Sequence, residues 1–130
     1  MSQITTRTLT PTEATAAIPA LSNILSDCVE GGASVGFMSP YTPDDAKPYW
    51  QGVAQAVAEG NTVLIVAEKD GEPLGTVQLG IGMMPNQPHR ADLKKLLVHR
   101  KARGLGLSRL LMEAAEAAAV KHKRHVLVLD

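Results

Sequence analysis

A basic stretch with two glycines holds the residues of this sequence that are best suited to chemistry. It runs from Val98 to Ser108 and reads Val-His-Arg-Lys-Ala-Arg-Gly-Leu-Gly-Leu-Ser. An apolar run precedes it and an amphipathic run follows, so we expect a strand to end and a helix to begin here. The N–H groups at a helix N-terminus lack partners and carry a partial positive charge, and they can therefore receive a phosphate. Small residues let a ligand approach the backbone, and neighbouring Arg and Lys side chains add charge-assisted hydrogen bonds.

Two further observations leave alternatives open for this stretch. It has neither the three-glycine spacing of a dinucleotide fingerprint nor the Gly-Lys-Ser/Thr of a P-loop, so a plain tight turn explains its composition equally well. Residues 1–89 carry three Lys/Arg against nine Asp/Glu, whereas residues 90–130 carry ten against four. The basic second half favours an anionic ligand, either nucleic acid or a phosphate-bearing cofactor. Solvated surface charges explain the same excess as well.

One strand and two helices are expected in the first sixty residues, before the strands that lead to this stretch. A strand is expected over residues 4–9. The sequence Thr10-Pro11-Thr12-Glu13 has the residues of a capping box and predicts a helix that ends at Gly31-Gly32, with Pro19 bending it or delaying its start. Thr42-Pro43-Asp44-Asp45 has the same capping pattern and predicts a helix that ends at Gly60, with Trp50 on its buried face.

Strands are expected after Gly60, because the helical spacing of apolar residues gives way there to a continuous β-prone run. Asp70-Gly71 predicts a tight hairpin turn between two strands, and Gly75, Gly80 and Gly82 are candidate bulges of the second strand. A strand, a helix and another strand in succession imply a parallel pair, so the sheet should be mixed. The predicted elements are strands over 62–67, 74–81, 93–98 and 126–129, a loop over 83–89, and a helix over about 104–121. We therefore expect one α/β (α+β) domain over residues 1–130, with a mixed sheet flanked by helices.

Composition narrows the class of protein. Hydrophobic residues make up 45% and charged residues 20% of the chain, as in soluble globular domains. The single cysteine, Cys28, favours a reducing cytoplasm. The four histidines have no metal-ligand spacing, so no metal is expected. Aromatic residues make up only 3%, and this disfavours stacking on the bases of a nucleic acid.

The segment Arg103-Gly104-Leu105-Gly106-Leu107-Ser108 resembles the Arg/Gln-x-x-Gly-x-Gly/Ala motif of the GNAT N-acetyltransferases. The expected element order is also similar to that fold. Within the family, residues 89–112 are similar to the tabtoxin-resistance acetyltransferases. The resemblance implies a GNAT-like acyl-CoA N-acyltransferase fold that binds acetyl-CoA and acetylates a primary amine of a small molecule or peptide.

The resemblance also implies roles for individual residues. The strand that ends at Val98 should splay from the strand over 126–129, and backbone groups of Leu96 and Val98 should pair with the pantetheine arm. Amides from Gly104 to Arg109 should hold the pyrophosphate. The residues assigned to cofactor binding are Leu96, Leu97, Val98, Arg103, Gly104, Leu105, Gly106, Leu107, Ser108 and Arg109.

Asp92 occupies a position where related enzymes place a general base, and if the strand alternates regularly it shares a face with Leu96 and Val98. A structural pair with Arg90 or Lys94 is the alternative role of Asp92. Tyr41 and Phe37 are candidates to line the acceptor site.

The chain departs from the family pattern in two ways. Ser108 stands where the motif prefers Gly or Ala, and we expect this small residue to be tolerated. The sequence ends at Asp130, before the helix and the two strands that complete the fold, so a C-terminally truncated domain is expected. The strand over 126–129 would then expose apolar side chains and an edge, which favours a homodimer. A non-catalytic module that binds CoA or a protein is the alternative function.

Overall fold

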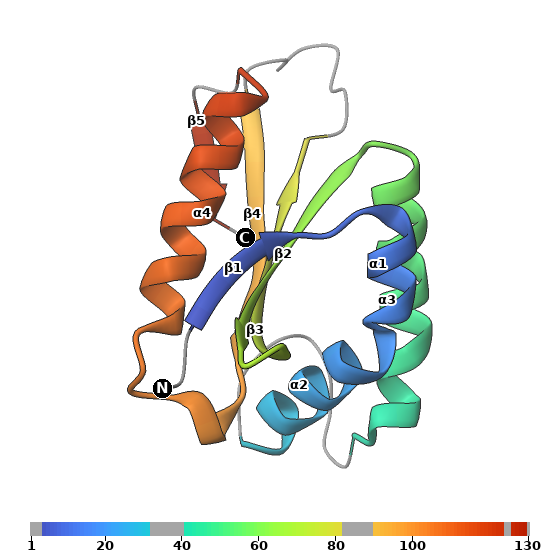
Figure 1. Cartoon of the computed structure of the whole chain (residues 1–130). Helices are drawn as coiled ribbons and strands as arrows, with labels where there is room; N and C mark the ends of the chain where they lie inside the picture. Colours follow the sequence, from blue (N-terminus) through green and yellow to red (C-terminus); the bar gives the residue numbers. More distant parts are fainter. Residues whose placement is uncertain (1–3, 32–40, 82–89, 124–125, 130) are drawn as a thin grey trace.

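A five-stranded sheet with helices on both faces forms the structure, which is a computed structural model (Figure 1). Residues 4–31, 41–81, 90–123 and 126–129 are described below. The strand order is β1-β2-β3-β4-β5, and the bounds are β1 Ile4–Thr8, β2 Thr62–Lys69, β3 Glu72–Gly80, β4 Arg90–Val98 and β5 Val126–Leu129. Neighbours from β1 to β4 are antiparallel, and β4 pairs with β5 in parallel. The predicted mixed sheet is therefore confirmed.

Three helices precede the second strand, namely α1 Pro11–Ala16, α2 Ile18–Glu30 and α3 Pro43–Ala58. Both predicted capping boxes are confirmed: the Thr10 hydroxyl accepts from the Glu13 N–H, and the Thr42 hydroxyl accepts from the Asp45 N–H. Sequence reasoning expected one helix from residue 11 to 30, but the structure has two that meet at Ala17. Pro19 explains the break, because proline lacks the N–H of an internal helix residue and fits the first turn instead.

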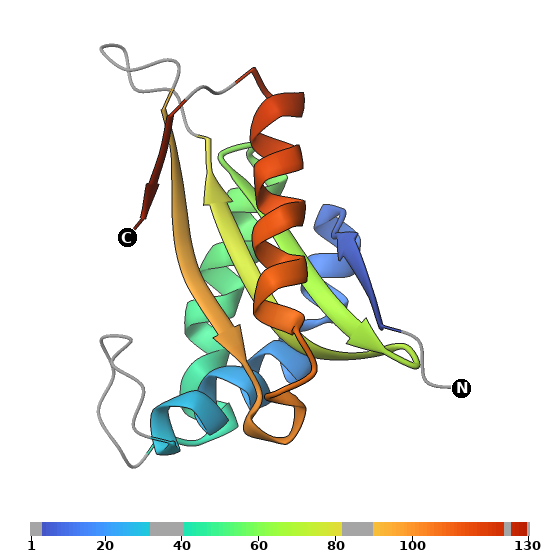
Figure 2. The same ribbon diagram turned by 90° about the vertical axis from the view of Figure 1, so that its left-hand side faces the viewer.

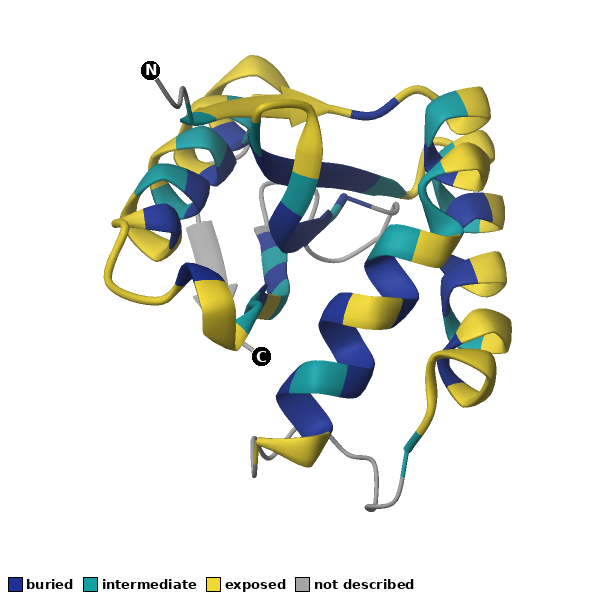
Figure 3. Cartoon of the chain, turned by 60° about the horizontal axis from the view of Figure 1, so that its bottom comes forward, coloured by how far each residue is buried: buried dark blue, intermediate teal, exposed yellow. Residues whose placement is uncertain are grey.

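The sheet separates two apolar clusters. One cluster joins α1, α2 and α3 to the sheet face that carries Leu64, Val66 and Leu97, and it includes Trp50, whose predicted burial is confirmed at 1% exposure. The other joins α4 to the opposite face, which carries Ile65, Val77 and Leu93. Figure 2 shows α4 on one side of the strands and α2 and α3 on the other. In Figure 3 the buried residues of the helices lie on the sides that face the sheet.

The hairpin between β2 and β3 has the predicted turn. Asp70 and Gly71 have φ values of 54° and 84°, the left-handed pair that a two-residue turn of this kind requires. One register irregularity falls between Ala67 and Glu68, opposite the predicted bulge region at Gly75. A second, which the sequence did not reveal, lies in β4. Thr76 pairs with Leu97 and Gln78 with Lys94, so β4 has one residue more than β3 here, and Lys95 has a φ of 51°.

Helix α4 spans Leu107–Lys121 and follows a short 3₁₀ helix over Arg100–Ala102. It begins three residues later than the expected start near Gly104. Its buried residues are Leu107, Leu111, Ala115 and Ala119. A Cβ at Gly75 of β3 would lie 3.1 Å from the Leu111 side chain, so the absence of a side chain there lets α4 lie close to the sheet. Among the described residues, no helix is both long enough and apolar enough to cross a bilayer.

Candidate functional site

The connection from β4 to α4 borders the largest of the hollows described here. We call residues 98–109 the basic turn. A cavity of about 590 Å³ is lined by Leu96, Val98, Ala102, Arg103, Gly104, Gly106, Leu107, Ser108 and Arg109. This volume lies within the range of small-molecule sites. Eight of the ten residues that the sequence assigned to cofactor binding therefore surround one cavity.

The start of α4 presents backbone donors to this cavity. Gly106 is the N-cap, with a φ of 79° and a ψ of 18°, and no side chain caps the helix. The first backbone bond of the helix runs from the Leu110 N–H to the Gly106 carbonyl at 3.2 Å. The amides of Leu107, Ser108 and Arg109 precede it and have no acceptor within the helix. Three N–H groups and the positive end of the helix dipole therefore meet at the cavity, an arrangement suited to an anion.

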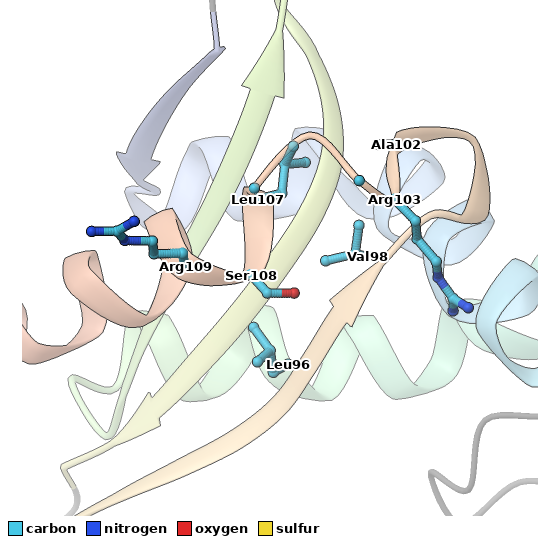
Figure 4. A pocket seen from close by; sticks show the side chains of 9 residues that line it. Leu96, Val98, Ala102, Arg103, Leu107, Ser108 and Arg109 are labelled. Carbon is cyan, nitrogen blue, oxygen red and sulfur yellow. The ribbon is translucent and has the colours of Figure 1, made fainter.

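Cationic and hydroxyl side chains add to these donors. Figure 4 shows Arg103 and Arg109 at opposite sides of the cavity, with Ser108 between them near Leu96 and Val98 of β4. Arg109 is exposed, and its Nε lies 3.2 Å from the Glu113 carboxylate, so part of its charge is balanced within α4. Arg103 is also exposed, and its side chain interacts with the Cys28 thiol of α2. Two arginines thus border the cavity in addition to the backbone donors.

The apolar wall of the cavity comes from the last residues of β4. The pairing of β4 with β5 joins residues 90–93 to residues 126–129, and Leu96 and Val98 lie beyond it. Figure 2 shows β4 continuing away from β5 after this paired portion. Leu96 is 39% exposed. This stretch of β4 thus offers an apolar edge next to the anion-binding amides.

The bulge at Lys95 determines which side chains of β4 lie on the same face of the sheet as Leu96 and Val98. Asp92 and Lys94 both pass within 3.6 Å of the place where a Cβ would lie at Gly80. That face also carries Gln78, whose amide donates to the Tyr49 hydroxyl of α3 at 2.9 Å. Val98, in contrast, packs against the α4 cluster. The expectation that Asp92 shares a face with Leu96 and Val98 is therefore wrong, because it assumed a regular strand, and the extra residue reverses the alternation.

Two assigned residues lie outside the cavity lining. The Leu97 side chain is 3% exposed and belongs to the cluster under α1–α3, so only its backbone is available to a ligand at the β4 edge. Leu105 is 43% exposed and borders a neighbouring hollow of about 330 Å³ that includes Lys69 and Lys101. Sequence reasoning missed Ala102, a fully buried residue that forms the cavity wall beneath the turn.

The last turn of α2 contacts the basic turn through Asp27, a contact that the sequence analysis did not predict. The Asp27 carboxylate accepts from the backbone N–H of Arg100 at 2.8 Å and from its Nε at 3.1 Å. Burial acts to raise the pKa of Asp27, but these hydrogen bonds and the charges of His99 and Arg100 outweigh it, so the pKa lies below its ordinary value. Burial also raises the pKa of the Cys28 thiol, whose Sγ lies 3.5 Å from the Val98 carbonyl oxygen.

A signal for this contact does exist in the sequence. Asp27 and Glu30 lie near the C-terminus of α2, which has no basic residue in its last turn. Carboxylates are disfavoured near the negative end of a helix dipole. An acidic residue in this position therefore suggests a partner elsewhere in the fold.

The other predicted candidates have local partners or lie outside the described residues. Tyr41 is half-buried; its N–H donates to the Glu30 carboxylate at 2.7 Å and its hydroxyl to the Asp45 carbonyl at 3.2 Å. Phe37 lies outside the described residues. Within the described part of the chain, no group of three or more His, Cys, Asp or Glu side chains has the arrangement of a metal site.

Residues 18–130 match the sequence model of the acetyltransferase (GNAT) family. Among solved structures, a ribosomal-protein-alanine N-acetyltransferase from Brucella melitensis is 26% identical with a TM-score of 0.75, over 96% of this chain and 72% of that protein. A candidate acetyltransferase from Acinetobacter baylyi is 22% identical with a TM-score of 0.77, over 99% of this chain and 70% of that protein. A Salmonella typhimurium protein solved with its cofactor acetyl-CoA is 19% identical with a TM-score of 0.71, over 97% of this chain and 68% of that protein.

Proposed function

The chain belongs to the GNAT acetyltransferase family, and from this premise we propose that it transfers the acetyl group of acetyl-CoA to a primary amine of a small molecule or peptide. The observation that carries the proposal is the cavity at the uncapped start of α4. It places backbone donors and two arginines at one end and an apolar strand edge at the other. Acetyl-CoA has the matching parts, a charged pyrophosphate joined to a less polar pantetheine arm that ends in the thioester.

The position of Gly106 supports this assignment on steric grounds. A Cβ built at Gly106 would meet no protein atom within 4 Å, so the glycine leaves open space at the mouth of the cavity. Its φ of 79° aims the following amides outward, in a conformation that other residues rarely adopt. The residues proposed to hold the pyrophosphate are Arg103, Gly104, Gly106, Leu107, Ser108 and Arg109. Leu96 and Val98 would lie along the pantetheine arm.

The proposed reaction is direct attack of the amine on the thioester. The nitrogen lone pair forms a bond to the carbonyl carbon, the carbon–sulfur bond then breaks, and the sulfur leaves with the bonding electrons as a thiolate. The amine loses one proton in forming the amide, and the thiolate takes up a proton to become the CoA thiol. A backbone N–H at the β4 edge would stabilise the charge on the carbonyl oxygen during attack.

Asp92 is our proposed acceptor for the amine proton, directly or through a water molecule. Its side chain lies on the α1–α3 side of β4, whereas the cavity lies at the α4 side. The amine would therefore approach from the α1–α3 side and meet the thioester at the part of β4 beyond its pairing with β5. A structural role in which Asp92 only interacts with its neighbours is the alternative.

The class of acceptor rests on resemblance alone. The similarity of residues 89–112 to tabtoxin-resistance acetyltransferases suggests a small-molecule amine. The likeness to the Brucella ribosomal-protein-alanine N-acetyltransferase adds peptide amines to the candidates.

Release of CoA thiol from acetyl-CoA, measured over a panel of primary amines and peptides, tests the proposed reaction. Asp92→Asn should lower kcat at neutral pH more than it weakens acetyl-CoA binding, because the proton acceptor is lost while the cavity is unchanged. Lys94→Gln, a change on the same face, is the matched control. Equal turnover of Asp92→Asn and the wild type across the pH range would assign Asp92 a structural role.

A further inference from the structure

We propose that Asp27 is a positioning residue for the basic turn, and that Gly31 completes its seat for Arg100. The inference rests on the proposed function, since the turn that Asp27 holds is the one proposed to bind the CoA pyrophosphate. Neither residue lines the cavity. Both lie at the end of α2, on the opposite side of the turn from the ligand.

The contact from Asp27 fixes the main chain as well as a side chain. One carboxylate oxygen accepts from the Arg100 backbone N–H at 2.8 Å, and the other accepts from the Arg100 Nε at 3.1 Å. The second oxygen also lies 3.6 Å from the His99 Nε2. The Asp27 side chain is only 13% exposed, so water competes weakly for these bonds. Bonds to two groups of one residue fix both the place and the direction of the chain as it leaves β4.

Gly31 lies four residues after Asp27, on the same side of the helix end. A Cβ at this position would lie 2.9 Å from the Arg100 Cδ and 3.2 Å from its Nε. Its φ of −79° is open to any residue, so the glycine contributes space and not backbone conformation, and a larger residue would shift the Arg100 side chain. Asp27 and Gly31 together therefore form a seat that the Arg100 side chain fills.

The path from this seat to the cavity is short and well packed. Arg100 begins the 3₁₀ helix, the Ala102 N–H donates to the His99 carbonyl at 2.9 Å, and Ala102 is fully buried. Arg103 and Gly104, which line the cavity, come next. Before Arg100 in the chain, the Val98 carbonyl is contacted by the Cys28 thiol. A displacement of Arg100 would therefore move the residues that face the pyrophosphate.

A second anchor on the same turn provides a natural contrast. The Lys101 Nζ lies 2.7 Å from the Glu72 carboxylate of β3. These two side chains are 53% and 59% exposed, and the pair involves no backbone group of the turn. Exposed pairs of this kind contribute little to stability or order. Glu72 is thus the matched control for Asp27, an acid that contacts the next residue of the same turn.

The test is calorimetric titration of acetyl-CoA into the full chain. We compare the wild type with Asp27→Ala, Asp27→Asn, Gly31→Ala and Glu72→Ala. We expect the Kd to rise about tenfold in Asp27→Ala, because acetyl-CoA must then order a turn that Asp27 no longer holds in place. Asp27→Asn should raise it less, because the amide oxygen can still accept from the Arg100 N–H. Gly31→Ala should raise it severalfold by displacing Arg100, and Glu72→Ala should leave it unchanged.

Amide hydrogen exchange without ligand separates positioning from a general loss of stability. In Asp27→Ala and Gly31→Ala, the hydrogen-bonded amides of residues 100–103 and 105 should exchange faster, while those of 111–119 in α4 should keep their protection. Wild-type Kd values for both variants, or equal loss of protection along α4, would overturn the inference. If Asp27→Ala does not fold, Gly31→Ala decides. A failure of the proposed function is distinct, because the wild-type chain itself would then not bind acetyl-CoA.

Discussion

Helices α1 and α3 begin differently from helix α4. Helices α1 and α3 start with a threonine, a proline and an acidic residue at the third position, and their own side chains bond the first amides. Helix α4 starts with a left-handed glycine, no side-chain cap and no acidic residue in its first turn. The first kind of helix start satisfies its donors within the chain, and the second leaves them directed into a cavity.

This difference separates residues that stabilise the fold from residues that bind a ligand. A side-chain cap contributes about 1 kcal/mol to the free energy of unfolding, and acidic residues near an N-terminus add to it. Helix α4 lacks both contributions, although its apolar face packs against the sheet. The missing cap is understandable if a phosphate takes its place in the working protein.

Gly106→Val should have the largest effect on ligand binding. The substitution strains the backbone at a φ of 79° and places two methyl groups at the mouth of the cavity. We expect the Kd for acetyl-CoA, measured by calorimetry, to rise by about a hundredfold or more, because the phosphate can no longer approach the amides.

Gly60→Val is the matched control for this change. Gly60, between α3 and β2, has a φ of 78°, and a Cβ there would also meet no atom within 4 Å. Both variants should lose a similar amount of stability, about 1–3 kcal/mol in thermal or urea unfolding. Only Gly106→Val should lose acetyl-CoA binding. Similar Kd values for the two variants would contradict the special role of the α4 start.

Ser108→Asp should move binding and stability in opposite directions. A carboxylate in the first turn of α4 complements the helix dipole, so the free energy of unfolding should rise by about 0.3–1 kcal/mol. The same charge would repel the pyrophosphate, and we expect the Kd for acetyl-CoA to rise about tenfold. Ser108→Ala, the neutral control, should bind almost as well as the wild type. A Ser108→Asp protein that binds normally would argue against an anion at these amides.

Thr42→Ala should give the converse result at a capped helix. Loss of the Thr42 cap should lower the free energy of unfolding by about 1 kcal/mol, as measured in urea. The acetyl-CoA Kd should not change, because α3 contributes no residue to the cavity lining. A higher Kd for acetyl-CoA in Thr42→Ala would mean that the cap of α3 does affect the ligand site.

The pH dependence of stability should show the smallest effect. The pKa of Asp27 is lower in the folded protein than its ordinary value, so the native state holds the ionised form more strongly than the unfolded chain does. Its contribution is therefore present above the ordinary value of 3.8 and is lost as the pH falls through the lowered pKa. In urea unfolding between about pH 5 and 2, Asp27→Asn should lose less stability than the wild type. Parallel curves for the two proteins would contradict this assignment.

Local patterns predicted much of this structure, and long-range contacts explain what they missed. The residue types in Thr10-Pro11-Thr12-Glu13 and Asp70-Gly71 determine a cap and a turn within a few residues, and both are confirmed. The motif at Arg103–Ser108 predicted a cofactor-binding turn, and a cavity borders this turn in the structure. The bulge at Lys95 has no local signature, because the register of β4 depends on its partner β3. The bond between Asp27 and Arg100 joins residues 73 positions apart, and no periodicity connects them.

The most direct test of the whole account is a calorimetric titration of acetyl-CoA into the wild-type chain, repeated at two salt concentrations. We expect one acetyl-CoA per chain and a higher Kd at the higher ionic strength, because helix amides and arginines hold the pyrophosphate. Absence of binding at either salt concentration would contradict the assignment of the cavity at the start of α4.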